Sequence, residues 1–323
     1  MDSQASDAFI SRKPVKKTKM EEMKEFFYDP QTGKIMGRTG SSWAQITLFY
    51  IIFYACLAGF FAICLYAFVQ TTSEHEPVYY GQGSIIGTNP GLGYQPWLRD
   101  DPESTLIKFK QSNDTTYAEY KKQMKKFLEK YTKEEFTSKV KDCGSETGKG
   151  TDDAAGGKGN KVEEGELACK FDVNQTLKEA GCNEKDDYGF KAGTPCIALT
   201  LNRLMGWKPV PFPDGSVPDV VLGQQHGKDR YISGDVAVNC EGEYYADEDN
   251  IGEVEYYPAS GFGAKYFPYK KYPVYHSPIV FVKFTGLAKG VLVMVECKAY
   301  AYNIVHDRQE KLGMVHFELL VDE

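Results

Sequence analysis

The chain has 323 residues, a formal net charge of −7 at pH 7 and a hydrophobic fraction of 42%. A negative net charge argues against nucleic acid as a partner, because such binding needs a basic surface that neutralises phosphates. The modest hydrophobic fraction favours a soluble body with a single membrane anchor over a protein that spans the membrane many times.

The first 42 residues form a polar tail of mixed charge. We expect its beginning to be mostly unstructured, because it has little apolar surface to bury. The clearest local signal is "FFYDPQTGKIMGRTG", residues 26–40, in which the Asp-Pro and Thr-Gly pairs predict turns. We therefore treat residues 1–42 as a tail in which only the last part has local structure.

An uncharged stretch, "LFYIIFYACLAGFFAICLYAFV", runs from Leu48 to Val69. About 20 apolar residues are needed to cross the hydrocarbon core, so residues 43–69 are predicted to form one transmembrane helix with Trp43 at an interface. A cleaved signal peptide is not expected, because a long polar tail precedes the stretch and no small-residue cleavage site follows it. No second stretch of this kind is present in the sequence.

Basic residues lie mainly on one side of this span. After it, no Lys or Arg occurs before Arg99. The basic residues before it are Arg12, Lys13, Lys16, Lys17, Lys19, Lys24, Lys34 and Arg38. The positive-inside rule then predicts a cytosolic N-terminus, with residues 70–323 on the outer side of the membrane.

The aromatic residues of the span are spaced so that one face of a helix carries them. The predicted stripe at i, i+3, i+4, i+7 and i+11 consists of Tyr50, Phe53, Tyr54, Leu57 and Phe61. Ala55, Gly59 and Ala62 form a groove of small residues elsewhere on the helix. Small residues permit close helix packing and tyrosine hydroxyls need polar partners, so the span is predicted to recognise another helix as well as to anchor. The alternative is that Tyr50 is an ordinary interfacial residue.

Beyond the span, "YGQGSIIGTNPGLGYQPW" from Tyr80 is rich in Gly and Pro, and it predicts an extended stalk or loop. Residues 116–140 then show helical spacing, and this amphipathic helix is the only clear one in the outer part. Its apolar positions are Tyr117, Tyr120, Met124, Phe127, Leu128 and Tyr131. The Gly-rich residues 144–160 that follow predict a flexible insert.

Six of the eight cysteines lie on the predicted outer side, without a CxxC motif or neighbouring histidines that would suggest zinc. They are Cys143, Cys169, Cys182, Cys196, Cys240 and Cys297. An oxidising compartment favours three disulfides, of which pairs of sequence neighbours are the simplest arrangement, although their number alone does not fix the connectivity. Two sequons, at Asn113 and Asn174, predict glycosylation on the same side.

The C-terminal half is predicted to be made of strands. "PIVFVKF" from Pro278, "VLVMVECKAYAY" from Val291 and "MVHFELLV" from Met314 are rich in β-branched and aromatic residues, with Gly-containing turns between them. We expect an antiparallel β-sandwich.

Catalytic motifs find little support in the sequence. "DED" at Asp247–Asp249 has a form that can hold a divalent cation, but a solvated acidic loop is the simpler interpretation. The histidines form no HExxH motif and no serine lies in a GxSxG motif. We therefore expect no catalytic residue, no metal site and no cofactor.

Several long blocks resemble the beta subunit of the sodium/potassium-transporting ATPase. The first is "GRTGSSWAQITLFYIIFYACLAGFF" from Gly37. Further blocks in the family's order are "PCIALTLNRLMGWKP" from Pro195, "VNCEGEYYADEDNIGEVEYYP" from Val238, "KYFPYKKYPVYHSPIVFVKF" from Lys265 and "VECKAYAYNI" from Val295. The resemblance covers nearly the whole chain.

This resemblance implies a single-pass type II glycoprotein of the plasma membrane with a mainly β outer domain, an immunoglobulin-like sandwich with an inserted helix. It implies a non-catalytic subunit that folds, delivers and stabilises a catalytic alpha subunit and tunes its potassium handling, with a small single-span regulatory subunit as a further partner. The implied disulfides are Cys143–Cys169, Cys182–Cys196 and Cys240–Cys297. The implied partner-binding residues are Tyr50, Phe53, Tyr54, Leu57 and Gly59 in the span, and Tyr266, Tyr269 and Tyr272 outside it.

The chain departs from the family at one tyrosine-rich block. The family's "YYPYYGK" is "YFPYKKY" here, with Phe267 and Lys270 in place of tyrosines. Two alternative functions remain open at this point: the beta subunit of a proton/potassium pump, and a pump-independent adhesion glycoprotein of the same architecture.

Overall fold

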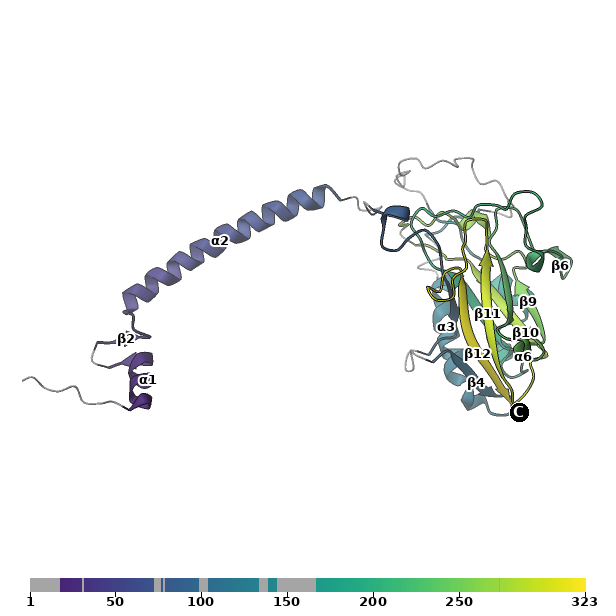
Figure 1. Cartoon of the computed structure of the whole chain (residues 1–323), viewed down its shortest axis with the longest axis horizontal. Helices are drawn as coiled ribbons and strands as arrows, with labels where there is room; N and C mark the ends of the chain where they lie inside the picture. Colours follow the sequence, from purple (N-terminus) through teal and green to yellow (C-terminus); the bar gives the residue numbers. More distant parts are fainter. Residues whose placement is uncertain are drawn as a thin grey trace, which may run out of the picture. The chain divides into compact units, whose positions relative to one another are not determined.

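The structure is a computed structural model that describes residues 18–30, 32–72, 77, 79–98, 104–133, 139–143, 167–272 and 274–323 (Figure 1). The chain divides into two compact units, Met1–Thr72 and Ser73–Glu323. The start of the tail and the predicted flexible insert, residues 144–160, lie outside the described residues.

The described tail residues of the first unit form a short helix followed by a hairpin. Helix α1 (Lys19–Phe27) leads into strand β1 (Tyr28–Asp29), which pairs with β2 (Lys34–Ile35). The turns predicted at Asp29-Pro30 and Thr32-Gly33 are present, and Gly33 takes a positive φ of 64° in the loop. The turn predicted at Thr39-Gly40 is wrong, because Thr39 is the N-cap and Gly40 the first residue of the next helix. The sequence did not predict helix α1, because its short apolar stripe is interrupted by charged residues of both signs.

Helix α2 (Gly40–Gln70) has 31 residues and extends slightly beyond the predicted 43–69 at both ends. At 1.5 Å per residue it is about 46 Å long, enough for the hydrocarbon core and part of both interfaces. It is the one helix in the described part of the chain that is long and apolar enough to span a membrane. The indole N–H of Trp43 donates a 2.9 Å hydrogen bond to the Ile35 carbonyl, which ties the hairpin to the first turn of α2.

The second unit is a mixed α/β body whose main elements are two four-stranded sheets. In spatial order, the first contains β3 (Leu92–Gln95), β5 (Cys196–Leu201), β10 (Ile279–Thr285) and β9 (Glu253–Tyr257). The second contains β4 (Leu106–Lys110), β12 (Met314–Asp322), β11 (Leu292–Tyr300) and β8 (Ala237–Gly242). A small hairpin pairs β6 (Gln224–Gln225) with β7 (Lys228–Asp229).

Aromatic side chains join the two sheets in a common core. The Phe317 ring on β12 lies 5.0 Å from the Tyr94 ring on β3 and 6.1 Å from the Phe284 ring on β10, between ring centroids. Along β12, Phe317, Leu319 and Val321 are buried and alternate with less buried residues, as the period of a strand requires. The three strands predicted in the C-terminal half are confirmed as β10, β11 and β12.

Two predictions about the strands are confirmed only in part. The sheets are not wholly antiparallel, because β4 pairs in parallel with β12, with Leu106 opposite Glu318. These strands are far apart in sequence, so no hairpin fixes their direction. The Gly- and Pro-rich stretch is also not simply a stalk, because Leu92 is buried and its segment joins the first sheet as edge strand β3.

The helices of this unit are short. Helix α3 (Ala118–Thr132) confirms the predicted amphipathic helix, and it buries Tyr120, Met124, Leu128 and Tyr131. It ends before the predicted residue 140, because no apolar residue continues the stripe after Tyr131. The described residues of this unit also form the α-helices α5 (Val173–Ala180) and α6 (Tyr245–Glu248). The 3-10 turns are η1 (Gly81–Gly83), η2 (Asp114–Thr116), η3 (Glu184–Gly189), η4 (Asp219–Val221) and η5 (Ala264–Tyr266).

Three disulfides cross-link this unit: Cys143–Cys169, Cys182–Cys196 and Cys240–Cys297. They are the pairs that the family resemblance implies. Cys240 and Cys297 are opposite each other on neighbouring strands β8 and β11, with their Cα atoms 4.0 Å apart. This bridge therefore lies within one sheet, whereas the disulfide of antibody domains joins two sheets.

Candidate partner-binding surfaces

The aromatic face of α2 is the first candidate surface. The rings of Tyr50 and Tyr54 stack with centroids 5.9 Å apart, and those of Phe49 and Phe53 with centroids 6.1 Å apart. Both pairs are four residues apart, the spacing that places side chains one above the other on a helix. We call Phe49, Tyr50, Phe53, Tyr54 and Leu57 the aromatic face. Phe49 was not predicted, although its i, i+4 relation to Phe53 is visible in "LFYIIFY".

No residue of α2 is buried within the structure, and the rings of Tyr50 and Phe53 are 49% and 47% exposed. The side of α2 that carries Ala55, Gly59 and Ala62 is also exposed. A Cβ atom added at Gly59 would meet nothing within 4 Å, so this side leaves room for close approach of another helix. The helix thus offers an aromatic face and a small-residue groove, neither covered by the described residues.

The second candidate surface is a group of tyrosines that we call the tyrosine cluster: Tyr266, Tyr269, Tyr272 and Tyr275. Tyr275 is at its centre, with its ring centroid 4.9 Å from that of Tyr269 and 6.4 Å from that of Tyr272. Its hydroxyl donates a 2.9 Å hydrogen bond to the Tyr266 carbonyl. The three tyrosines implied by the resemblance are therefore held together by a fourth.

Arg203 completes the tyrosine cluster from another part of the chain. Its guanidinium carbon lies 5.2 Å from the centroid of the Tyr275 ring and 5.6 Å from that of Tyr269. Its Nε donates to the Ser277 hydroxyl over 2.9 Å. Cation–π contacts of this kind orient the rings as well as stabilise them. Nothing in the local sequence around Arg203 indicated this contact.

The cluster is partly buried in its own unit. Burial raises the pKa of Tyr266 to about 12, and burial also raises the pKa of Tyr275. The Tyr266 ring packs on Phe171, with centroids 5.6 Å apart. These phenols therefore stay neutral at physiological pH. Each of the two side chains is partly buried against the second unit and partly exposed. Tyrosine suits a half-wet interface because it combines a large apolar ring with a polar tip.

A buried histidine lies behind the cluster. His276 is 1% exposed and its ring centroid lies 5.1 Å from that of Tyr131, whose hydroxyl donates to the Ser277 carbonyl over 2.7 Å. Burial lowers the pKa of His276, and the nearby Lys130 and Lys170 charges lower it further. Burial, assisted by the Arg203 charge, also lowers the pKa of Lys130 to about 8. This part of the core therefore holds an imidazole that resists protonation.

We predict that His276 makes the second unit sensitive to mild acid. Its folded pKa is below the unfolded value of about 6.5, so the unfolded chain binds the extra proton as pH falls below that value. The free energy of unfolding should therefore drop below about pH 6.5, with a slope that approaches 1.4 kcal/mol per pH unit at most for one group. Replacing His276 by Phe keeps a ring beside Tyr131 and should flatten this limb in urea titrations between pH 5 and 7. An unchanged slope would contradict the assignment.

The first residue of the acidic run "DED" has a structural role. Asp247 is 8% exposed, and its two carboxylate oxygens accept hydrogen bonds from the backbone N–H groups of Tyr244 (3.2 Å) and Met294 (3.0 Å). The Asp247 carboxylate thus links α6 to β11 through hydrogen bonds. No group of three or more His, Cys, Asp or Glu side chains that could hold a metal ion occurs among the residues that the structure describes.

Both sequon asparagines occupy exposed positions of the second unit. Asn113 precedes η2, and its side-chain oxygen accepts from the Thr115 backbone N–H at 3.1 Å and from the Thr115 hydroxyl at 2.7 Å. Asn174 lies in the first turn of α5. A glycan could therefore be attached at either position without disturbing the core.

The geometry on these surfaces is that of a chain with a single apolar helix, a disulfide-bonded body and aromatic side chains left open for a partner. The comparisons with known proteins agree. The family model described as "Sodium / potassium ATPase beta chain" matches residues 13–317. The chain belongs to this family, whose members are non-catalytic accessory subunits of the sodium/potassium-transporting ATPase.

Individual relatives match over nearly their full length. A probable sodium/potassium-transporting ATPase subunit beta-3 of Caenorhabditis briggsae is 42% identical over 307 residues, which cover 95% of this chain and 89% of the relative. Subunit beta-2 of Drosophila melanogaster is 34% identical and covers 96% and 95% of the two chains. Human subunit beta-2 is 31% identical, with 94% and 95% covered.

Proposed function

We propose that this chain pairs one to one with the catalytic alpha subunit of a sodium/potassium-transporting ATPase, supports its folding, membrane delivery and stability, and tunes its potassium handling. The observation that carries the proposal is the aromatic face of α2, which is open along its length and continues in register from Phe49 to Leu57. A plain anchor has no need of tyrosine hydroxyls within its apolar stretch.

Helix recognition in a membrane depends on packing and on a few hydrogen bonds, since lipid tails are as apolar as leucine. Each interhelical hydrogen bond contributes only about 0.6–2 kcal/mol. Single changes on the aromatic face should therefore alter the strength of pairing and the apparent potassium affinity, whereas they should not abolish assembly.

The experiment removes the two hydroxyls and keeps the rings. In the Tyr50→Phe/Tyr54→Phe variant we expect the alpha subunit to dissociate more readily in detergent, by between about 7-fold and about 700-fold for two lost hydrogen bonds, and the apparent potassium affinity of the pump to shift. Tyr66→Phe is the comparison for the aromatic face, because helical spacing places position 66 on the opposite side of α2 from positions 50 and 54, along the small-residue groove. Equal behaviour of the two variants would contradict recognition through this face.

We further propose that the tyrosine cluster is the contact outside the membrane. Its support is the partial exposure of the rings of Tyr266, Tyr269 and Tyr272 and their fixed orientation around Tyr275 and Arg203. A preoriented ring loses little side-chain freedom on binding, which favours its use in an interface.

We infer a type II orientation at the plasma membrane, with residues 1–42 cytosolic, 43–69 in the membrane and 70–323 outside. The basic residues before the span, the three disulfides after it and the exposed sequons all support this orientation. Glycans at Asn113 and Asn174 belong to the same proposal.

We also infer that the outer body is a variant of the immunoglobulin-like sandwich. Two four-stranded sheets that share an aromatic core support this view, and α3 is then the inserted helix. The variant differs from antibody domains in its parallel β4–β12 pair and in its within-sheet disulfide.

A further inference from the structure

The tail before the membrane helix carries an apolar stripe that its own unit does not cover. On α1, Met20, Met23 and Phe27 follow the i, i+3, i+7 spacing and are 67%, 58% and 56% exposed. Methionine and phenylalanine rarely stay in water as a continuous helical stripe without a partner. We call α1 with its hairpin β1–β2 the tail module.

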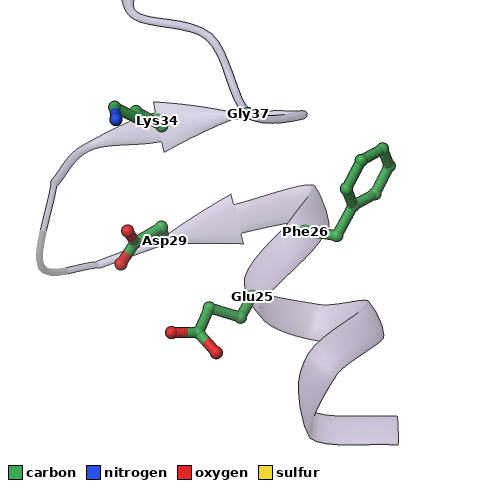
Figure 2. A pocket seen from close by; sticks show the side chains of 5 residues that line it. All are labelled: Glu25, Phe26, Asp29, Lys34 and Gly37. Atoms are coloured by element: carbon green, nitrogen blue, oxygen red, sulfur yellow. The ribbon is translucent and has the colours of Figure 1, made fainter. Parts of the chain in front are cut away.

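Two lysines border this stripe, and the sequence of α1 also contains three glutamates, Glu21, Glu22 and Glu25. At 100° per residue, Lys19 and Lys24 flank the stripe on its two sides, while Glu25 falls almost opposite its centre. Figure 2 shows the side chain of Glu25 together with that of Asp29 on one side of the tail module and the Phe26 ring on the other side. Lysines at the border of an apolar stripe can reach lipid headgroups while the stripe is immersed.

Two further features connect the tail module with the membrane helix and with a basic sequence. The hydrogen bond from Trp43 to the Ile35 carbonyl fixes the hairpin beside the first turn of α2, so the tail module begins where the membrane helix begins. The sequence that leads into α1, "RKPVKKTK" at residues 12–19, holds five basic residues and no acidic one, and the last of them, Lys19, is the first residue of the helix. Basic runs next to a membrane helix are attracted to anionic lipids of the cytoplasmic leaflet.

From these observations we propose that the tail module docks on the anionic cytoplasmic leaflet, with Met20, Met23 and Phe27 immersed at the interface. The positive charge of the sequence at residues 12–19 favours an anionic surface. The proposal rests on the cytosolic position of the tail proposed above, but not on pairing with an alpha subunit. Docking would fix the rotation of α2 about its own axis, and hence the direction in which the aromatic face points.

The test uses the full chain with a single reactive thiol. Cys56 and Cys64 are replaced by alanine, and the six other cysteines are in disulfides. A polarity-sensitive fluorophore is attached in one protein at Met23→Cys, on the stripe, and in a second at Glu25→Cys, two residues further on but on the opposite side of α1. Each protein is reconstituted in vesicles of phosphatidylcholine, with or without phosphatidylserine.

We expect a blue-shifted emission at position 23 in vesicles with phosphatidylserine and a water-like emission at position 25. Each basic residue near an anionic surface contributes about fivefold to binding, so Lys16→Gln/Lys17→Gln/Lys19→Gln should lower the ratio of docked to undocked module roughly 100-fold. High salt should also weaken docking, because it shortens the distance over which the basic residues and the anionic lipids attract each other.

Identical emission at the two positions, or emission at position 23 that does not change with phosphatidylserine, would overturn the proposal. So would shielding of position 23 that appears only when a catalytic subunit is co-reconstituted, because this result would assign the stripe to a protein contact. Co-purification of the alpha subunit is measured on the same samples, so failure of lipid docking and failure of pairing are separate results.

Discussion

Replacing Cys240 and Cys297 together by alanine is expected to lower the free energy of unfolding of the second unit by about 4 kcal/mol. The two cysteines are 57 residues apart in sequence, and in the loop-entropy model the stabilisation grows with the length of the closed loop. Removing Cys182–Cys196, with a separation of 14 residues, should lower it by about 3 kcal/mol. The loss is a large fraction of the stability of a typical domain, so we also expect less alpha subunit to be retained.

Chemical denaturation of the full chain in mild detergent measures both variants. The transition is followed by tryptophan fluorescence, to which Trp97 and Trp207 of the second unit contribute beside Trp43 of α2. The matched control is Cys56→Ala/Cys64→Ala, because these two cysteines are free and exposed on α2. The control should leave the transition unchanged. A transition of the Cys240→Ala/Cys297→Ala protein that coincides with the control, or a free thiol at any of the six bridged positions in native protein, would contradict this account.

Asp247→Ala is expected to destabilise the second unit by about 2–4 kcal/mol, because the backbone N–H groups of Tyr244 and Met294 would both lose their carboxylate acceptor. The backbone around Asp247 has little room to move and find other hydrogen-bond partners. A Cβ atom on Gly242 would lie only 2.3 Å from the Glu248 nitrogen, which shows how closely β8 and α6 approach each other. Denaturant titration of the variant measures the effect.

Asp249→Ala provides the control within the same acidic run. Asp249 is exposed, so its replacement should change the free energy of unfolding by no more than about 0.5 kcal/mol. Addition of Mg²⁺, Mn²⁺ or Ca²⁺ should not shift the denaturant midpoint of the unsubstituted protein. Equal effects of the two substitutions, or stabilisation by one of these ions that requires Asp247, would favour a metal site after all.

The elements that the sequence predicts well are those in which one segment carries the whole signal. Helix α2 needs only its apolar length, and strands β10, β11 and β12 need only β-branched and aromatic residues between turns. Helix α1 escaped prediction because a stripe of Met20, Met23 and Phe27 is short and interrupted by charges. Local pattern therefore identified long or strongly apolar elements and missed a short amphipathic one.

Pairings between distant segments depend on tertiary contacts that no local pattern reports. The parallel partner of β12 is β4, which lies near the beginning of the second unit, and the edge strand β3 lies in a stretch whose Gly and Pro content predicts a loop. The tyrosine cluster illustrates the same limit. The block around Tyr269 is visible in the sequence, but Arg203, which orients it, hydrogen-bonds Ser277 across a separation of 74 residues.

Pairing with a catalytic subunit is tested most directly by affinity isolation of the native protein from its own membranes in mild detergent. We predict that a large P-type ATPase catalytic subunit co-purifies with it in a one-to-one ratio. A chain in which Leu48–Val69 is replaced by polyleucine of equal length should retain clearly less, because it anchors without an aromatic face. Absence of any P-type ATPase from the isolated native complex would contradict the account.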